Sequence, residues 1–351
     1  MTDFQPDNVT LSRRRLLTGA ATLLISHSLL WTAPAAAQVI DSRQLGQIAD
    51  RARELDQLNS LIIARDGEVQ FAEALRGPGL DRTVNIKSVS KTLMAALVGI
   101  ALDRGILDNV NQSVAELLPD SMPNDADPRI RQITVDHLLT MRAGLERTSG
   151  PNYGRWVASD NWVRFALSRP IVAEPGGRML YSTGSYHLLA AILTRLTGSS
   201  VLALARDWLG EPLAIAIPPW TRDPQGIYMG GNNMALSPNA LLKFGEMYRR
   251  QGRFDDRQII SRNWVETSWQ PRTRSPFSGD YYGYGWFIDS IRGHGAYYAR
   301  GYGGQLVYLV PELGLTVVIT SDPTRPARSG GYFSDLKALL TDQIIPAAEQ
   351  T

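Results

Sequence analysis

The most constraining feature of the chain is a serine and a lysine three positions apart at the start of its most apolar segment. Ser88 and Lys91 precede or open an almost uninterrupted apolar run, from Thr92 to Leu102, that stops at Gly105. A helix that is apolar on all sides must be buried, and residues three apart lie on one face of a helix. We therefore expect a buried central helix with Ser88 and Lys91 within reach of each other at its N-terminus.

This pair has the chemistry of a nucleophile and its base. A serine hydroxyl attacks a carbonyl carbon once a neighbouring base removes its proton. A lysine can be that base when burial lowers its pKa from about 10.4 towards neutrality. The N-terminus of a helix also favours developing negative charge. The four-residue pattern is not unique, because Ser334 and Lys337 match it too. They fall on an amphipathic C-terminal segment, where a lysine is expected to face solvent, so we interpret them as a surface coincidence.

Composition limits the possible functions. The 351 residues are 44% hydrophobic and 20% charged, as in an ordinary soluble globular protein. A net charge of +2 gives no reason to expect nucleic acid as a partner. The absence of cysteine excludes disulfides and thiolate metal sites. No His, Asp or Glu spacing resembles a metal site, and no glycine loop has the context of a nucleotide site. The sequence predicts neither a metal nor a cofactor.

The N-terminus has the pattern of an export signal. Three arginines, residues 13–15, follow a polar leader and precede a moderately apolar run that ends at Trp31. A run of small residues then offers a cleavage site after Ala37. Residues 1–37 are therefore predicted to be a twin-arginine-type signal peptide, with a periplasmic or secreted mature chain. An uncleaved membrane anchor is the alternative, but the apolar run is short and interrupted, and no later segment reaches membrane-spanning length.

Hydrophobic periodicity places strands at both ends of the mature chain and helices in the middle. A helix is expected over 41–57, followed by a hairpin of strands 60–65 and 69–72. Further strands are expected over 282–288, 296–299, 305–310 and 315–320, before a last helix over 332–345. Shorter helical patterns cover 114–118, 135–141, 162–167, 186–196, 201–209 and 240–248. We predict an α+β fold in which an antiparallel sheet, flanked by helices, is built from both termini. Its sheet lobe comprises about 38–105 and 251–351, and an inserted, mostly helical lobe comprises about 106–250.

Two more segments of the chain supply groups that a Ser/Lys hydrolase needs. Tyr181 lies between a Pro-Gly-Gly loop and an apolar helix, where it can relay a proton to a leaving group; the alternative is a tyrosine that only packs or caps. Tyr302, Gly303 and Gly304 enter a strand and can bring backbone N–H groups close to a carbonyl oxygen. His137 lies in a helical pattern and is interpreted as a packed residue, since no Gly-x-Ser-x-Gly elbow supports a Ser-His-Asp triad.

The Ser88–Lys91 pair, the Tyr181 segment and the glycine-rich turn, in this order, resemble the class C β-lactamase-related family of serine hydrolases. That family includes β-lactamases, D-alanyl-D-alanine peptidases, carboxylesterases and 6-aminohexanoate-oligomer hydrolases. The resemblance covers most of the mature chain and implies a two-lobed β-lactamase-like fold. It also implies that Ser88 is acylated, Lys91 is its base and Tyr181 is the proton relay. The oxyanion hole would use the backbone N–H of Ser88 and of a residue near Gly304. The segments that carry the resemblance are 88–91, 133–145, 175–177, 181–183 and 301–312.

Two departures from the family pattern bear on the substrate. Thr183 stands where the family's β-lactamases have Asn, and Gly301 stands where they have the Lys or His of Lys-Thr-Gly or His-Thr-Gly. The missing cation normally steers a substrate carboxylate, and the adjacent Arg300 is a candidate substitute. We therefore favour cleavage of an ester or simple amide of a small molecule, with the 6-aminohexanoate branch as the most similar.

Three alternatives remain open from the sequence. One is a true β-lactamase or D-Ala-D-Ala peptidase, and another is a non-catalytic module that binds cell-wall peptides. The third concerns the substrate site and not the function: Tyr302 and three tryptophans could line a pocket for an apolar acyl group. For each tryptophan, packing in the core is the preferred interpretation; the three are Trp156, Trp220 and Trp286.

Overall fold

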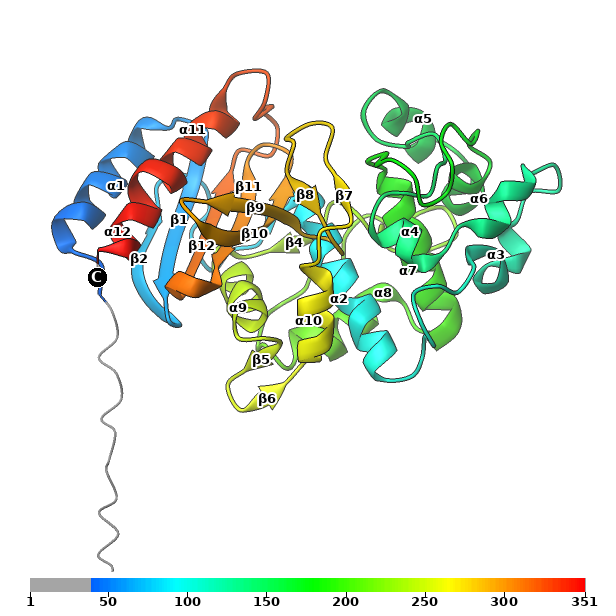
Figure 1. The fold of residues 1–351 in the computed structure, drawn as a ribbon, viewed down its shortest axis with the longest axis horizontal. Coiled ribbons are helices and arrows are strands. Elements are labelled where there is room, and N and C mark those ends of the chain that lie inside the picture. The colour runs from blue at the N-terminus through cyan, green and yellow to red at the C-terminus, as the bar shows by residue number, and fades with distance from the viewer. Residues whose placement is uncertain (1–38, 351) are drawn as a thin grey trace, which may run out of the picture. The chain divides into compact units, whose positions relative to one another are not determined.

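The centre of the fold is an antiparallel sheet of eight strands in the order β2-β1-β12-β11-β10-β9-β8-β7 (Figure 1). The computed structural model describes residues 39–350, so the predicted export signal lies outside it. Strand β1, from the start of the described chain, pairs with β12 from its end, with Ile62 opposite Val318. The predicted antiparallel sheet, built from strands near both ends of the described chain, is therefore confirmed. Its strands are β1 (Leu58–Arg65), β2 (Glu68–Ala74), β7 (Thr273–Arg274), β8 (Tyr281–Tyr282), β9 (Phe287–Ile291), β10 (His294–Gly301), β11 (Gln305–Val310) and β12 (Leu315–Ser321).

Helices cover both faces of this sheet. In β11, Val307 and Leu309 face helix α9, because a Cβ added to Gly245 of α9 would lie 3.0 and 3.3 Å from them. Tyr308 points the other way, towards Leu340 in the C-terminal helical segment. Figure 1 shows this segment beside α1. The helices concerned are α1 (Ser42–Glu54), α9 (Pro238–Arg249), α11 (Tyr332–Ala338) and α12 (Ile345–Glu349), with π-helical Leu339–Ile344 between the last two.

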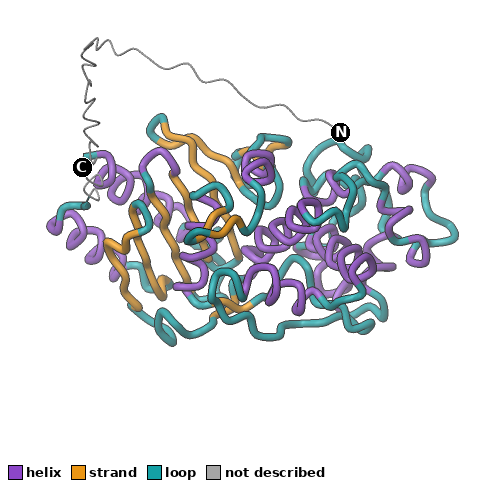
Figure 2. The backbone as a smooth tube through the Cα atoms, turned by 90° about the horizontal axis from the view of Figure 1, so that it is seen from below, coloured by secondary structure: helices purple, strands orange, loops and turns teal. Residues whose placement is uncertain are grey.

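A mostly helical region lies beside the sheet, as Figure 2 shows. Its helices are α3 (Val114–Leu117), α4 (Val135–Leu139), α5 (Tyr153–Val157), α6 (Trp162–Leu167), α7 (Thr183–Thr197) and α8 (Val201–Ala205). Helix α9, which the sequence places in the same lobe, packs instead against β11 and β12. Among the described residues, no single helix has the length and apolarity of a membrane span; the bent pair Thr183–Thr197 and Val201–Gly210 passes on length and composition alone.

The expected strand over residues 282–288 is wrong. A tight turn interrupts it between β8 and β9, where the Gly283 N–H donates to the Trp286 carbonyl at 2.9 Å. Gly285 has a φ of +78°, and a Cβ there would lie 2.8 Å from the Ala95 side chain. All residues from Tyr282 to Phe287 are buried. Close packing of this turn on α2 (Ser90–Asp103), rather than strand pairing, explains its aromatic and glycine content.

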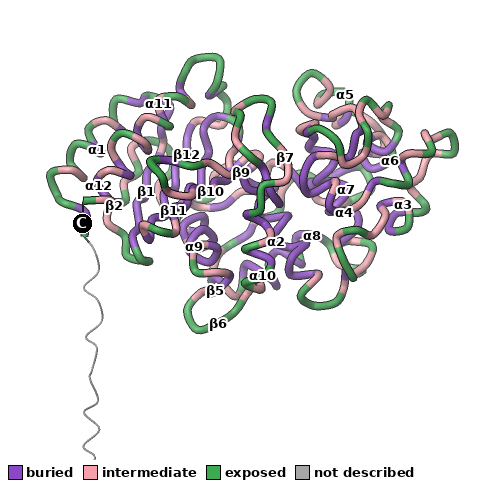
Figure 3. Tube along the Cα trace, in the orientation of Figure 1, coloured by how far each residue is buried: buried purple, intermediate pink, exposed green. Residues whose placement is uncertain are grey.

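Helix α2 is the buried central helix that the apolar run predicts. Every residue from Ser90 to Ala101 is buried, and Figure 3 shows the helix in the buried colour along most of its length. It runs between the sheet and the helical region and contacts both α7 and β10. The Ser88–Lys91 pair therefore lies at the junction of the two structural halves.

A matched pair of glycines tests how tightly α2 is packed. A Cβ at Gly99 would lie 2.4 Å from the indole of Trp264 in α10 (Arg262–Ser268), whereas a Cβ at Gly46 in α1 meets nothing within 4 Å. Gly46→Ala is expected to stabilise the fold by up to about 1 kcal/mol through helix propensity. Gly99→Ala is expected to destabilise it by about 1–3 kcal/mol, because overpacking outweighs that gain. Urea unfolding of both variants measures the difference, and equal effects would contradict this packing.

Candidate active site

Ser88 is presented by a short strained segment rather than by the first turn of α2 itself. After strand β3 (Val84–Asn85), Lys87 adopts a φ of +50°, which is unusual for a residue with a side chain. The Asn85 side chain accepts a hydrogen bond from the Lys87 N–H at 2.9 Å and supports this conformation. Residues Lys87–Val89 then form one 3₁₀ turn that leads into α2. The hydroxyl of neighbouring Ser90 is occupied, because it donates to the Lys87 carbonyl and accepts from the Met234 N–H.

Lys91 reaches Ser88 from within the protein. Its side chain is buried, and its Nζ lies 3.0 Å from Ser88 Oγ. The same nitrogen lies 3.3 Å from Thr183 Oγ1 and 2.5 Å from the carbonyl oxygen of Gly231. Within the described part of the chain, no carboxylate pairs with it. Burial without a counter-ion lowers the pKa of Lys91 to about 7. A substantial fraction of Lys91 is therefore neutral near pH 7 and can accept the Ser88 proton.

Tyr181 also contacts the Ser88 side chain. Its ring centroid is 4.9 Å from Lys91 Nζ. Burial raises the pKa of Tyr181, while its contact with the Ser88 side chain and the positive charge of Arg300 oppose that rise. The phenol therefore stays protonated near neutral pH, as a proton donor must. The structure thus brings Ser88, Lys91 and Tyr181 together, although they come from different segments.

Thr183 lies against Lys91. It is the first residue of α7 and is buried. Ser149 holds it through two hydrogen bonds of 2.9 Å, one to its backbone N–H and one with its hydroxyl. Ser149 and Gly231 were not identified from the sequence. The signals available for them were two clusters of turn-forming residues, Arg147-Thr148-Ser149-Gly150 and Gly230-Gly231-Asn232-Asn233.

The predicted oxyanion residues form the turn between β10 and β11. Gly303 and Gly304 have φ values of +83° and +98°. The Gly304 N–H is used within the turn, where it donates to the Gly301 carbonyl at 3.2 Å. Among the described residues, no hydrogen-bond acceptor faces the backbone N–H groups of Ser88, Tyr302 and Gly303. The structure therefore leaves Tyr302 and Gly303, rather than Gly304, with free donors.

This turn lies close to Ser88, and two of its carbonyl groups accept hydrogen bonds from side chains. A Cβ on Gly301 would lie 2.5 Å from the Ile86 carbonyl oxygen, so only glycine lets β10 come this near the Ser88 segment. Gln57 donates to the Gly303 carbonyl at 3.0 Å, and Ser321 donates to the Gly304 carbonyl at 3.1 Å. Because these hydrogen bonds fix both carbonyls, the turn can present its free N–H groups to a substrate.

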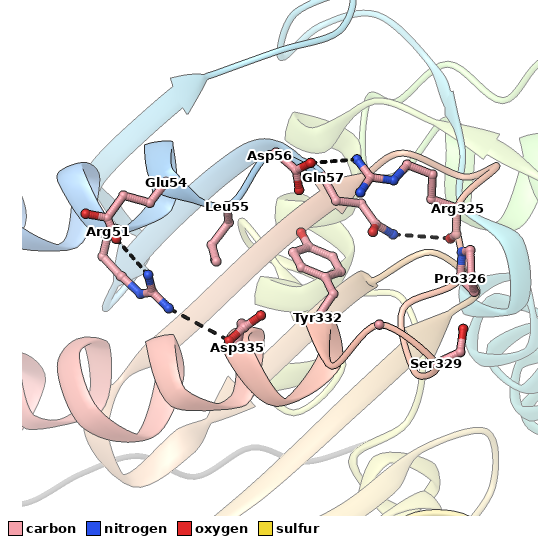
Figure 4. A pocket seen from close by; sticks show the side chains of 11 residues that line it. Arg51, Glu54, Leu55, Asp56, Gln57, Arg325, Pro326, Ser329, Tyr332 and Asp335 are labelled. Atoms are coloured by element: carbon pink, nitrogen blue, oxygen red, sulfur yellow. Dashed lines mark hydrogen bonds and ion pairs between the residues drawn. The ribbon is translucent and has the colours of Figure 1, made fainter.

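Gln57 also lines a surface pocket that is separate from the Ser88 site. Figure 4 shows its amide directed towards the Arg325 carbonyl, to which it donates at 3.2 Å. Neither Ser88, Lys91 nor Tyr181 lines this pocket. Its charged side chains pair with one another, as in Arg325 with Asp56 at 3.0 Å. We therefore assign no substrate to it.

The remaining predicted residues are accounted for by packing. Trp156 and Trp286 are completely buried, which confirms core packing over an acyl pocket for both; Trp220 is half-buried and donates to the Met229 carbonyl. The His137 ring packs under Gly176 and accepts a hydrogen bond from the Thr134 N–H, so the packed-residue interpretation is confirmed as well.

The second Ser-x-x-Lys pair lies on the surface. Ser334 and Lys337 are exposed, and Lys337 pairs with Asp289 at 3.0 Å.

Comparison with known proteins decides the family. The model of the family described as Beta-lactamase matches residues 57–340. The chain belongs to this family. An esterase from Burkholderia gladioli, EstB, is 28% identical over 176 residues, which cover 44% of this chain and 44% of EstB. The chain thus matches less than half of that relative's length.

Solved structures of other proteins share the fold at low sequence identity. A protein provisionally named 6-aminohexanoate-dimer hydrolase, from Bacillus anthracis, superposes with a TM-score of 0.72 at 15% identity, covering 90% of this chain and 87% of that one. A D-stereospecific amidohydrolase from Streptomyces superposes with a TM-score of 0.65 at 18% identity, covering 86% and 99%. The predicted resemblance to β-lactamase-related proteins and the predicted fold class are both confirmed.

Proposed function

We propose that the protein is an exported serine hydrolase that cleaves an ester or amide bond through an acyl-enzyme on Ser88. The observation that carries this proposal is the 3.0 Å contact between Ser88 Oγ and Lys91 Nζ, with Lys91 buried and unpaired among the described residues. A non-catalytic peptide-binding module would gain nothing from a lysine buried without a counter-ion, because such burial lowers the stability of the fold. The esterase and the amidohydrolase among the similar proteins support the reaction class.

Each residue of the site has its own role in the reaction. Lys91 takes the proton from Ser88 Oγ as that oxygen forms a bond to the substrate carbonyl carbon. The negative charge that develops on the carbonyl oxygen is stabilised by the free N–H of Ser88 and that of Tyr302 or Gly303. Tyr181 hands a proton to the leaving alcohol or amine as the bond to it breaks. Water then attacks the acyl-enzyme, and the same groups return Ser88 to its starting state.

Thr183 and Gly231 hold Lys91 in place during these steps. Their oxygens accept from Nζ, so the amine nitrogen is held 3.0 Å from Ser88 Oγ. Ser149 in turn fixes the Thr183 hydroxyl. In this proposal Thr183 is a positioning residue for the lysine.

Mass spectrometry of the exported protein tests nucleophile and export together. The full chain is expressed with its leader, recovered from outside the cytoplasm and incubated with a fluorophosphonate. The expected product is a chain that starts at Gln38 and carries one adduct, mapped to Ser88. Failure to form an adduct, or an adduct on another serine, would contradict the mechanism; a chain that retains residues 1–37 would contradict the export signal. Nitrocefin and a D-Ala-D-Ala peptide, assayed beside p-nitrophenyl esters, measure the β-lactamase and peptidase alternatives.

A further inference from the structure

Gln57 is a buried glutamine that connects the start of β1 to the turn between β10 and β11. Only 3% of it is exposed, and its backbone carbonyl accepts a hydrogen bond of 2.9 Å from the Asp322 N–H, directly after β12. Its side-chain nitrogen donates to the carbonyls of Gly303 and Arg325, at 3.0 and 3.2 Å; Figure 4 shows the second contact. Both hydrogens of the amide are therefore used. The amide cannot be reversed, because its oxygen would then face two carbonyl oxygens.

The geometry of peptide units links this contact to the free N–H groups of the turn. The peptide bonds of the turn are trans, so the C=O of one residue and the N–H of the next point in opposite directions within one plane. With the Gly303 carbonyl held by Gln57, the Gly304 N–H points the other way. It donates to the Gly301 carbonyl at 3.2 Å, and this bond directs the Tyr302 N–H away from it. Gln57 thus sets the direction of the Tyr302 N–H through two peptide units.

A second buried glutamine acts on the neighbouring peptide unit. Gln305, the first residue of β11, is fully buried and exchanges two hydrogen bonds with the backbone of Ser321, at 2.8 and 3.1 Å. Its side-chain nitrogen also lies 3.4 Å from the Tyr302 carbonyl, which belongs to the same peptide unit as the Gly303 N–H. This contact is longer than the one that Gln57 makes, so it holds the Gly303 N–H less firmly. The Tyr302 N–H is therefore the more firmly held of the two free donors.

We propose that Gln57 is a positioning residue for the oxyanion hole and that the donor it positions is the Tyr302 N–H. This inference rests on the proposed function, in which an N–H of this turn stabilises the carbonyl oxygen as it becomes negative. A preorganised donor is effective because it needs no rearrangement when the charge develops. Without the Gln57 amide, the Gly303–Gly304 peptide unit can rotate, and its N–H leaves the Gly301 carbonyl. The Tyr302 N–H then loses its fixed direction.

Replacing Gln57 by Met tests this role, because Met keeps the length of the side chain and removes both N–H donors. Gln57→Met is expected to lower kcat for p-nitrophenyl acetate by about 10- to 100-fold, less than the loss of a whole oxyanion donor. KM should change by less than about twofold, because the carbonyl oxygen becomes negative only in the transition state. The acid limb of the pH profile should stay in place, since the hydrogen bonds of Lys91 go to Ser88, Thr183 and Gly231.

A transition-state analogue measures the oxyanion hole directly. When Ser88 Oγ adds to the carbonyl carbon of a trifluoromethyl ketone, Lys91 takes the hydroxyl proton. The electron pair of the carbonyl bond moves onto the oxygen, which becomes negative. The inhibition constant of such a ketone is expected to rise in Gln57→Met by the same factor as kcat/KM falls. A lower kcat/KM without this parallel rise would assign Gln57 a purely structural role and overturn the proposal.

Two matched variants separate an effect on the oxyanion hole from the loss of a hydrogen bond elsewhere. Gln258, in the hairpin of residues 253–258, also donates to two carbonyls, at 2.9 and 2.6 Å. Gln258→Met should therefore keep the wild-type kcat and inhibition constant. Ser321→Ala removes the hydrogen bond to the Gly304 carbonyl, whose peptide unit carries neither of the two free N–H groups. It should lower kcat less than Gln57→Met, and equal losses in these two variants would overturn the proposal.

A second substitution keeps the test decisive should Gln57→Met fail to fold. Gln57→Glu has the shape of the native side chain, and the pocket that Gln57 borders can hydrate the added charge. A carboxylate donates no hydrogen bond, so the same loss of kcat and of ketone affinity is expected. Wild-type values in either folded variant, with Ser88 of the wild type labelled by the fluorophosphonate, would refute this inference alone. Absence of labelling in the wild type would refute the proposed function.

Discussion

Replacing Ser88 by Ala is expected to lower kcat/KM for ester hydrolysis by at least about 10⁴-fold, as loss of a nucleophile does in other serine hydrolases. Among the described residues, the only other side-chain hydroxyl that accepts a hydrogen bond from Lys91 Nζ is that of Thr183. Thr183 is buried and bound to Ser149, so it is poorly placed to attack a substrate. Steady-state hydrolysis of a p-nitrophenyl ester measures the loss, and unchanged circular dichroism shows that the variant is folded.

The second Ser-x-x-Lys of the chain provides the matched control. Ser334 lies exposed on α11 with Lys337 paired to Asp289, so the same four-residue pattern occurs there without burial. Ser334→Ala is expected to retain wild-type turnover. Activity of Ser88→Ala within tenfold of the wild type, or a comparable loss in Ser334→Ala, would show that burial of the pattern does not determine its role.

The parts of this fold that could be predicted are those set by local pattern. The apolar run after Lys91 admits only a buried helix, and α2 is one. Asp66 and Gly67 both adopt the positive φ values that a tight hairpin requires, so the first hairpin could be predicted from two residues. The pairing of β1 with β12 agrees with the strand patterns at both ends of the described chain and the helical stretch between them.

The contacts that could not be predicted join segments far apart in the sequence. Lys91 and the Gly231 carbonyl are separated by 140 residues, and no local pattern in either segment specifies their contact. Which N–H of the glycine turn remains free likewise depends on the turn geometry, since the bond from Gly304 to Gly301 exists only in the folded turn. The run from Tyr282 to Ile288 has strand composition, yet packing of Gly285 against Ala95 requires a turn there. Tertiary packing overrides local preference at these places.

The activity is expected to rise with pH through about 7, because Lys91 must be neutral to accept a proton and burial lowers its pKa to about 7. The kcat/KM of the wild type should therefore fall about tenfold per unit of pH below that value. Lys91→Met is expected to lose activity by about 10³-fold or more at every pH, since no general base remains beside Ser88. Lys337→Met is the control and should keep both the activity and the pH profile. An acid limb centred far from pH 7, or one retained in Lys91→Met, would assign the base to another group.

The same lysine should make the stability of the wild type depend on pH in a way that Lys91→Met does not share. The pKa of Lys91 falls from 10.5 to about 7 on folding, so between these values the unfolded chain binds more protons than the folded one. Stability then rises with pH across this window, and the cost of burying Lys91 is fully present below pH 7. From pH 7 to pH 9.5 the free energy of unfolding of the wild type should increase by about 3 kcal/mol relative to that of Lys91→Met. Urea unfolding at the two pH values measures this, with Lys337→Met following the wild type. Parallel pH dependence of the wild type and Lys91→Met would mean that Lys91 stays protonated in the folded protein, and with it the proposed base would fail.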